Sequence, residues 1–159
     1  MMMNCARVML LLFGVCASAG AQCPRGTLAV IVNKSNPTLS LSMAQLRQLL
    51  IGDVRVWPDH KAVTLIERDP ASRVFQCSLA KIVRLSPPEY ERYLQGAEFR
   101  GEEALRVEKS DSDASSARLV AGSEGSLAIV NLSSVAAIAG WVKIVRVDAK
   151  NPGEPGYPL

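Results

Sequence analysis

The sequence predicts an α/β domain in which helices cover both faces of one central β-sheet. Two continuous apolar runs rich in β-branched residues, residues 27–32 and 63–66, are typical of strands buried on both faces. The segments that follow these runs carry helix-start signals and apolar residues at helical spacing. Strands that alternate with helices in this way predict a sheet enclosed on both sides.

Three serines mark the expected helix starts, because serine at an N-cap accepts a hydrogen bond from the first turn. They are Ser42, Ser72 and Ser86. The first and the third are followed three residues later by glutamine or glutamate, which is the capping-box spacing. We expect Gly52 to close the first of these helices and the third to end near Gly96.

Weaker patterns complete the domain. The expected elements are a strand at 105–107, a helix at 111–121 closed by Gly122, and strands at 127–130 and 141–147. No repeat or low-complexity segment interrupts the chain, so residues 22–150 are expected to form one domain. Residues 151–159 are rich in proline and glycine and are expected to be an irregular tail.

Composition narrows the class of protein. The 159 residues include 18 basic and 15 acidic side chains, and 48% of the residues are hydrophobic, which suits one compact domain. A near-balanced charge lacks the basic stripe that nucleic-acid binding needs. Aromatic residues make up 5% of the chain, too few for a base-stacking surface. We therefore expect no nucleic-acid partner.

The first residues have the order of a secretory signal peptide. Arg7 precedes the apolar run 8–17, and small residues follow it. This run is shorter than the about 20 residues that cross a bilayer. We expect residues 1–21 to be removed by cleavage after Ala21, with cleavage after Ala19 as the near alternative. The mature protein is then expected to be periplasmic or secreted, soluble, and without stable membrane insertion.

Cleavage would leave two cysteines, Cys23 and Cys77. In an oxidising compartment two thiols can form a disulfide. The alternative is that Cys77 is a small buried apolar residue on a helix face. The sequence leaves both possibilities open.

The junction between the second strand and its helix, residues 66–72, is the place where we expect ligand chemistry. In open α/β sheets, ligands bind at the carboxyl ends of strands, where helix N-termini favour anions. Arg68 adds a planar cation suited to a tetrahedral oxyanion, and Ser72 offers a hydroxyl. The structural alternative is that Ser72 only caps the helix and that Arg68 belongs to a solvated ion pair.

Four segments resemble, in the same order, parts of the phosphate-binding proteins of ABC transporters. They are residues 30–37, a strand and turn; residues 41–52 with Trp57, a helix-Gly-loop-Trp pattern; residues 120–130, which resemble a segment that usually reads Gly-Ala-Ile-Gly-Tyr-Val; and residues 157–159. The resemblance covers nearly all of residues 22–159. It implies a single lobe of the type II periplasmic-binding fold, with a mixed central sheet and helices on both faces, and no enzymatic activity.

In that family the strand-to-helix junction reads Arg-x-Asp-Gly-Ser-Gly-Thr, and its Arg, Ser, Gly and Thr hold the phosphate. By spacing, Arg68 and Ser72 match the family pattern, whereas Arg73 and Val74 stand in place of the Gly and the Thr. The resemblance therefore implies that these four residues bind phosphate or a similar oxyanion. Arg73 either supplies a second cation or points to solvent.

Relatives hold phosphate between two lobes, and residues 22–159 correspond to the middle lobe only. One cleft wall excludes less water than two, so we expect weak affinity unless a second chain completes the cleft. The expected partners besides the anion are an ABC permease, a second lobe or another copy of the chain. The alternative function is a degenerate lobe that acts as a protein–protein interaction module in the cell envelope.

The sequence lacks the motifs of other chemistries. It has no Gly-x-Ser-x-Gly segment, no phosphate loop, no dinucleotide fingerprint and no zinc-ligand spacing. Its single histidine, His60, lies in an expected loop and is interpreted as a surface residue. We expect no catalysis, no cofactor and no metal. Glu102, Glu103 and residues 108–113 are expected to form a solvated acidic face.

Overall fold

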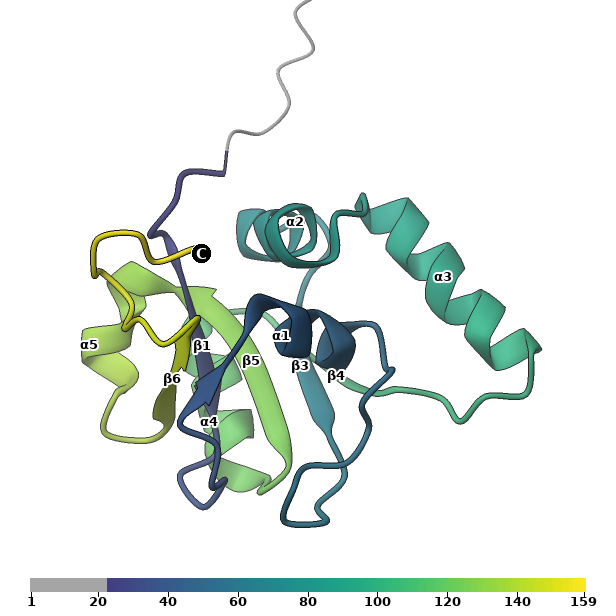
Figure 1. The fold of residues 1–159 in the computed structure, drawn as a ribbon, viewed down its shortest axis with the longest axis horizontal. Coiled ribbons are helices and arrows are strands. Elements are labelled where there is room, and N and C mark those ends of the chain that lie inside the picture. Colours follow the sequence, from purple (N-terminus) through teal and green to yellow (C-terminus); the bar gives the residue numbers. More distant parts are fainter. Residues whose placement is uncertain (1–22) are drawn as a thin grey trace, which may run out of the picture.

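The structure, a computed structural model, describes residues 23–159, so the expected signal peptide at 1–21 lies outside the described residues. Six strands form one sheet in the order β2-β6-β1-β5-β3-β4 (Figure 1). The strands are β1 (Leu28–Val32), β2 (Ser40–Leu41), β3 (Thr64–Arg68), β4 (Arg106–Ser110), β5 (Ser126–Asn131) and β6 (Lys143–Val147). Strand β1 is antiparallel to β5 and β6, whereas β3 is parallel to β4 and β5. The predicted mixed sheet is confirmed.

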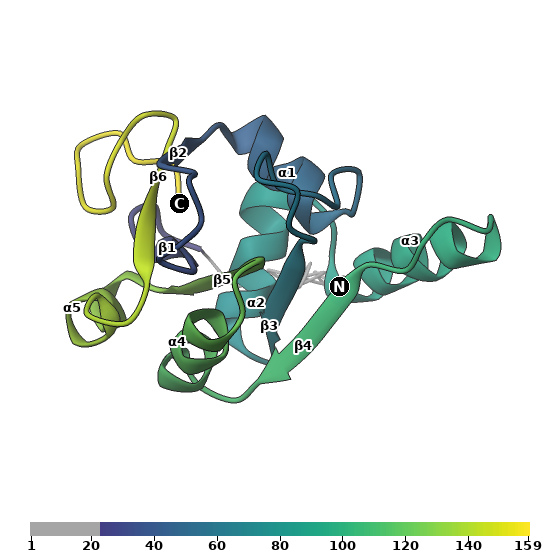
Figure 2. The same cartoon turned by 90° about the horizontal axis from the view of Figure 1, so that it is seen from below.

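Helices cover both faces of this sheet, as predicted (Figure 2). The helical elements are α1 (Met43–Leu50), α2 (Arg73–Ser78), the π-helical turn η1 (Leu79–Val83), α3 (Pro87–Phe99), α4 (Asp113–Gly122), the 3-10 turn η2 (Leu132–Ser134) and α5 (Val135–Ile138). One apolar core lies between the sheet and α1, α2, η1 and α3. A second, smaller core lies between the opposite face and α4 and α5. Within the described part of the chain, no helix is long and apolar enough to cross a membrane.

Strand β1 contributes to both cores, which explains its continuous apolar sequence. Successive side chains of a strand point to opposite faces. Val30 and Val32 therefore belong to the larger core, whereas Ala29 and Ile31 belong to the smaller one. All five residues of the strand are buried, as the sequence predicts.

The three predicted helix starts are confirmed. At α1, the Ser42 hydroxyl accepts from the Gln45 backbone N–H at 3.1 Å, and the Gln45 side chain accepts from the Ser42 N–H at 2.8 Å. At α3, the Ser86 N–H donates to the Glu89 carboxylate at 2.8 Å. Hydrogen bonds from the Ser86 hydroxyl and N–H hold the pKa of Glu89 below its usual value.

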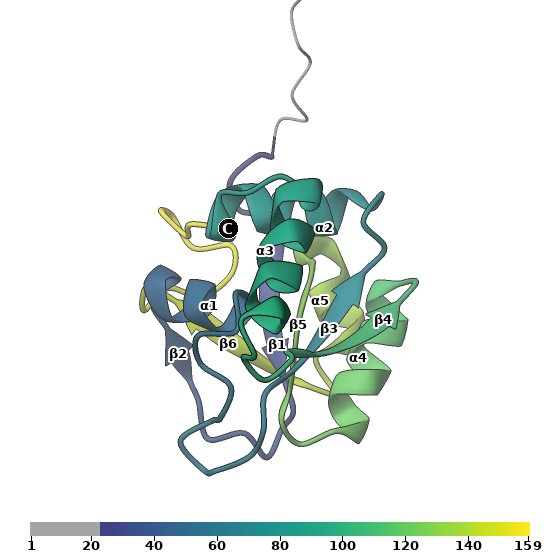
Figure 3. The ribbon, with the colours of Figure 1, turned by 90° about the vertical axis from the view of Figure 1, so that its right-hand side faces the viewer.

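The expectation that the third helix ends near Gly96 is wrong. Helix α3 continues to Phe99, and it is Gly101, with φ of 78°, that takes the left-handed conformation after the helix. Figure 3 shows α3 as the outermost element on its side of the molecule. It is anchored by Tyr90, which is 3% exposed and whose hydroxyl donates to the Leu50 carbonyl oxygen of α1 at 2.6 Å.

Strand β4 also extends beyond its expected bounds, and two short elements, β2 and α5, were not predicted. Strand β2 has two residues and α5 has four, so neither carries a hydrophobic period of its own.

The tail at 151–159 contains no helix or strand, as predicted, yet its last residues pack against the domain. Tyr157 and Leu159 are buried, and the Leu159 carbonyl accepts from the Thr27 N–H at 3.1 Å. The described chain therefore ends beside the start of β1 (Figure 1).

Candidate oxyanion-binding site

Arg68 is the last residue of β3, and side-chain alternation turns it toward α4. Leu65 lies in the larger core and Ile66 in the smaller one, so Arg68 shares the face of Ile66. Its Nη1 donates to Asp113 Oδ1 at 2.5 Å, and its Nη2 donates to the Asp111 carbonyl oxygen at 2.9 Å. The guanidinium thus contacts the start of α4, whereas α2 packs on the opposite face of the sheet.

Asp113 is the partner that the sequence analysis assigned to a solvated acidic face, and for this residue that expectation is wrong. Its side chain is 10% exposed, and Arg68 occupies Oδ1. The other oxygen, Oδ2, accepts from the Asn131 side chain at 2.8 Å, the Asn131 N–H at 3.3 Å and the Ser134 hydroxyl at 2.6 Å. Asp113 can be buried because the end of β3, the end of β5 and the turn η2 all supply it with donors.

The guanidinium of Arg68 is largely enclosed. The side chain is 14% exposed, and its Nε has no hydrogen-bond partner among residues 23–159. Arg68 also lines a cavity of about 30 Å³ whose other walls are mainly apolar, including Phe75 and Leu79. A buried donor without a partner is costly, and among the buried side-chain atoms of residues 66–72 this Nε–H is the one that the described fold leaves without a partner.

Ser72 is the N-cap of α2. Its hydroxyl accepts from the Phe75 N–H at 3.2 Å. In this structure Ser72 therefore caps the helix, as the structural alternative in the sequence analysis stated. Because a hydroxyl has one proton and two lone pairs, Ser72 retains an O–H to donate. Asp69 shapes the preceding turn: its carboxylate accepts from the Ala71 N–H at 2.7 Å, and its carbonyl accepts from the Ser72 N–H at 2.8 Å.

Arg73 and Val74, the first residues of α2, line a groove of about 520 Å³. Opposite walls come from the segment before β1 and from the end of β5. The remaining lining residues are Pro24, Gly26, Thr27, Leu28, Cys77, Asn131, Leu132 and Ser133. The Arg73 side chain is exposed, whereas Val74 is 5% exposed and has only its backbone N–H to offer an anion. Asn131 joins the two parts of the site, because it lines this groove and also donates to Asp113.

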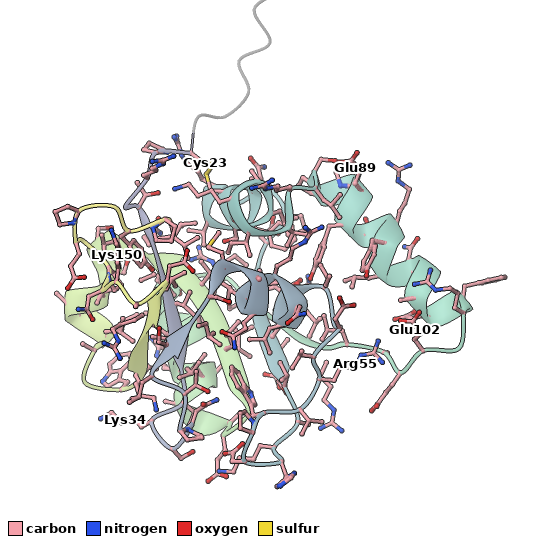
Figure 4. The ribbon with its side chains drawn as sticks, in the orientation of Figure 1. Cys23, Lys34, Arg55, Glu89, Glu102 and Lys150 are labelled. Atoms are coloured by element: carbon pink, nitrogen blue, oxygen red, sulfur yellow. A yellow bond between two sulfur atoms is a disulfide. The ribbon has the colours of Figure 1, made fainter. Side chains whose placement is uncertain are left out.

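A disulfide holds one wall of the groove in place. Cys23 and Cys77 are bonded, so of the two possibilities left open by the sequence the structure contains the bridge (Figure 4). Two further contacts hold the segment after Cys23 at the Pro24 carbonyl oxygen. The Thr27 hydroxyl donates to this oxygen at 2.8 Å, and the Lys81 ammonium group contacts it as well. Burial, with a contribution from nearby Arg25, lowers the pKa of Lys81.

The four predicted ligand residues therefore lie at one end of the sheet but do not form a single cluster. Ser72, Arg73 and Val74 stand at the start of α2, and Arg68 pairs with Asp113. The sequence analysis missed Asp113 and Asn131. Asn131 is the last residue of β5, and Asp113 is the first residue of α4, shortly after β4. Polar residues at the carboxyl ends of strands do carry a signal, because ligands of α/β sheets bind there. The meeting of Asp113 and Asn131 depends on the strand order, which no local pattern contains.

The other residues considered in the sequence take no part in this arrangement. His60 is exposed in a turn with φ of 66°. Between residues 23 and 159, no group of three or more His, Cys, Asp or Glu side chains is arranged to hold a metal ion.

Several solved structures with this fold are described as phosphate receptors or phosphate-binding proteins. An ABC-type phosphate transport receptor from Vibrio cholerae superposes with a TM-score of 0.64 at 16% identity, over 84% of this chain and 53% of that one. PstS from Borrelia burgdorferi gives a TM-score of 0.65 at 14% identity, over 79% and 49%. A putative phosphate ABC transporter substrate-binding protein with bound phosphate, from Clostridium perfringens, gives 0.56 at 18% identity, over 81% and 49%.

No family model matches the sequence, and no curated protein does so. The chain spans about half the length of the solved structures that it resembles. The resemblance inferred from the sequence is thus confirmed at the level of the fold. The chain has the α/β fold of the substrate-binding proteins of phosphate ABC transporters, in a short form that corresponds to about half of their length.

Proposed function

We propose that this protein is an exported, single-lobe binding protein for phosphate or a similar oxyanion. It acts in the periplasm after removal of residues 1–21 and takes part in uptake by an ABC transporter. The protein is a carrier and has no catalytic role. The fold supports this proposal, because its solved neighbours include an ABC-type phosphate transport receptor and a putative phosphate ABC transporter substrate-binding protein.

The observation that carries the proposal is the position of the start of α2 at the rim of the 520 Å³ groove. The first N–H groups of a helix have no partner within it, and the helix dipole there favours an anion. In the proposed complex Arg73, the backbone N–H of Val74 and the Ser72 hydroxyl contact the oxyanion. Arg68 supplies positive charge from the end of β3.

The lobe forms one wall around this anion. Ligand sites that bind tightly bury most of the ligand surface, and a single wall leaves one side of the anion in water. Each hydrogen bond then contributes less, because the surrounding dielectric is high. We therefore propose that a second polypeptide, such as the permease or another lobe, covers the exposed side during transport.

The proposal is tested with the mature protein by thermal unfolding and calorimetry, titrating inorganic phosphate and sulfate at constant ionic strength. A ligand that binds only the folded state raises the melting temperature. Phosphate at millimolar concentration is expected to raise it in the wild type and not in Arg68→Gln. Arg106→Gln, which removes an exposed cation from β4, is the matched control and keeps the response. A wild-type protein without any response at 10 millimolar phosphate would contradict the proposal.

A second function is favoured by one specific contact. Arg68 already pairs with Asp113, and the Ser72 hydroxyl already caps α2, so both of these proposed ligands have partners inside the fold. The second proposal is that the lobe acts as a protein–protein interaction module in the envelope. It predicts no response to either anion, together with a stable complex or self-association in light scattering of the mature protein. A monomer that captures nothing from envelope extract would exclude it.

A further inference from the structure

The carboxylate of Asp113 stands beside the Arg68 guanidinium, where an external anion would otherwise neutralise it. We infer that Asp113 is an internal anion that competes with the external oxyanion for Arg68 and so weakens binding. Asp113 is thus a positioning residue of the site. The inference rests on the proposed function, and it concerns a residue that the sequence analysis did not assign to the site.

The first step of the argument is the closeness of the pair. Arg68 Nη1 and Asp113 Oδ1 are 2.5 Å apart, and the two side chains are 14% and 10% exposed. In such an environment charges interact more strongly than in water. A negative ligand that approaches Arg68 therefore meets a cation whose charge is already balanced, and it is repelled by the carboxylate at close range.

The second step is the rigidity of the carboxylate. Asn131 and Ser134 hold Oδ2 through three hydrogen bonds, so Asp113 remains in place when an anion arrives. Arg68 is held as well, because its Nη2 donates to the Asp111 carbonyl oxygen at 2.9 Å. The ligand cannot take over the guanidinium without breaking contacts on both sides of the pair.

The third step is the route between the pair and the groove. Asn131 donates to Asp113 and also lines the groove at the start of α2. Asn131 thus connects the Asp113 carboxylate to the groove where the anion is proposed to bind. Removing the charge of this carboxylate while keeping the shape of the side chain leaves Arg68 as an unbalanced cation and strengthens anion binding.

The test is the affinity of Asp113→Asn for inorganic phosphate and for sulfate, measured by calorimetry beside the wild type. We expect the variant to bind both anions about tenfold more tightly, a difference of about 1.4 kcal/mol in binding free energy. Glu91→Gln is the matched control. It removes one negative charge from an exposed position of α3, on the opposite face of the sheet from Arg68 and Asp113, and it is expected to bind as the wild type does.

The outcomes separate this inference from the proposed function. If the wild type binds and Asp113→Asn binds more tightly, both stand. If only Asp113→Asn binds, the inference stands and phosphate binding by the natural protein is overturned. If the variant binds no more tightly than a wild type that does bind, the inference is overturned alone. If neither protein binds either anion, both are overturned.

A second measurement applies if the substitution unfolds the chain. Asp113→Asn and Asp113→Ser are then followed by circular dichroism while phosphate is added. If an external anion can take the place of the carboxylate, phosphate restores the folded circular-dichroism signal of these variants. Phosphate is expected not to restore it in double variants that also carry Arg68→Gln. If phosphate increases the folded circular-dichroism signal of neither Asp113→Asn nor Asp113→Ser, the inference is refuted.

Discussion

The indole N–H of Trp57 donates a hydrogen bond to the carbonyl oxygen of Gly125 at 2.9 Å. The same oxygen accepts from the Thr64 N–H at 3.0 Å, so one carbonyl joins the loop after α1 to the starts of β3 and β5. Trp57 and Gly125 belong to two of the segments on which the sequence resemblance rests. In this chain their contact is a buried packing contact far from the groove, which explains how such residues can mark a fold without binding a ligand.

Gly125→Ala is expected to destabilise the protein by about 2 kcal/mol, a typical cost of overpacking. A Cβ atom on Gly125 would lie 1.9 Å from the Ala62 carbonyl oxygen, and this neighbour is backbone that cannot turn away. The free energy of unfolding from urea titration measures the effect. Gly122→Ala is the control, because Gly122 lies in α4 with no atom near the added Cβ, and its stability is expected to be unchanged or slightly higher. Equal stabilities for the two variants would contradict this account.

Reduction of the disulfide is expected to lower the free energy of unfolding by about 4 kcal/mol according to the chain-entropy model. Cys23 and Cys77 are separated by 54 residues, so the bridge restrains a long loop in the unfolded chain. Urea titration with and without a reducing agent gives the difference. The double substitution Cys23→Ser with Cys77→Ala should already have the lower stability and should not respond to the reductant. An unchanged unfolding midpoint of the reduced wild type would show that the bridge does not stabilise the fold.

Stability is expected to fall at alkaline pH because of Tyr90. Burial, with the nearby Glu67 carboxylate, raises the pKa of the Tyr90 hydroxyl well above its usual value. The unfolded chain loses this proton near pH 10, about the reference value, whereas the folded chain retains it. The folded state then binds more protons than the unfolded state, so the free energy of unfolding decreases as the pH rises above about 10.

Tyr90→Phe is expected to flatten this pH dependence and to cost about 1–2 kcal/mol at neutral pH, since the Leu50 carbonyl loses its donor. Part of the slope should remain, because burial raises the pKa of Tyr157 as well. Tyr93→Phe is the control: Tyr93 is 37% exposed, and its variant should keep the wild-type profile. Urea titrations between pH 8 and 11 provide the comparison, and a Tyr90→Phe profile as steep as that of the wild type would refute the assignment.

Asp113→Ala is expected to destabilise the protein by about 3 kcal/mol even without any anion, because it leaves a mostly buried guanidinium unpaired. Replacing both partners, as in Arg68→Met with Asp113→Ala, should cost less than Asp113→Ala alone, since no uncompensated charge remains. Thermal and urea unfolding of the wild type, Arg68→Met, Asp113→Ala and the double variant complete a double-mutant cycle. Arg100→Gln, which breaks an exposed pair with Glu102, is the control and should change stability little. Additive effects of the two substitutions would mean that the pair is not coupled.

Much of the architecture follows from local patterns in the chain. The caps at Ser42, Ser72 and Ser86 involve residues three positions apart, so their signals are complete within one helical turn. The apolar run of β1 reports burial on both faces because a strand alternates its side chains. The α/β class and the location of a polar junction at the end of β3 were predictable for these reasons, whereas the mixed sheet was expected from the family resemblance.

The contacts of that junction were not predictable, because they depend on which strands become neighbours. Arg68 and Asp113 are 45 positions apart, and they meet only because β3 lies between β4 and β5, with all three parallel. A hydrophobic period tells which face of a strand is buried, and it carries no information about the strand beside it. Long-range packing also buries Asp113 and fixes the irregular tail at Leu159 against the start of β1. Local propensity therefore accounts for the elements, and the pairing of distant strand ends accounts for the site.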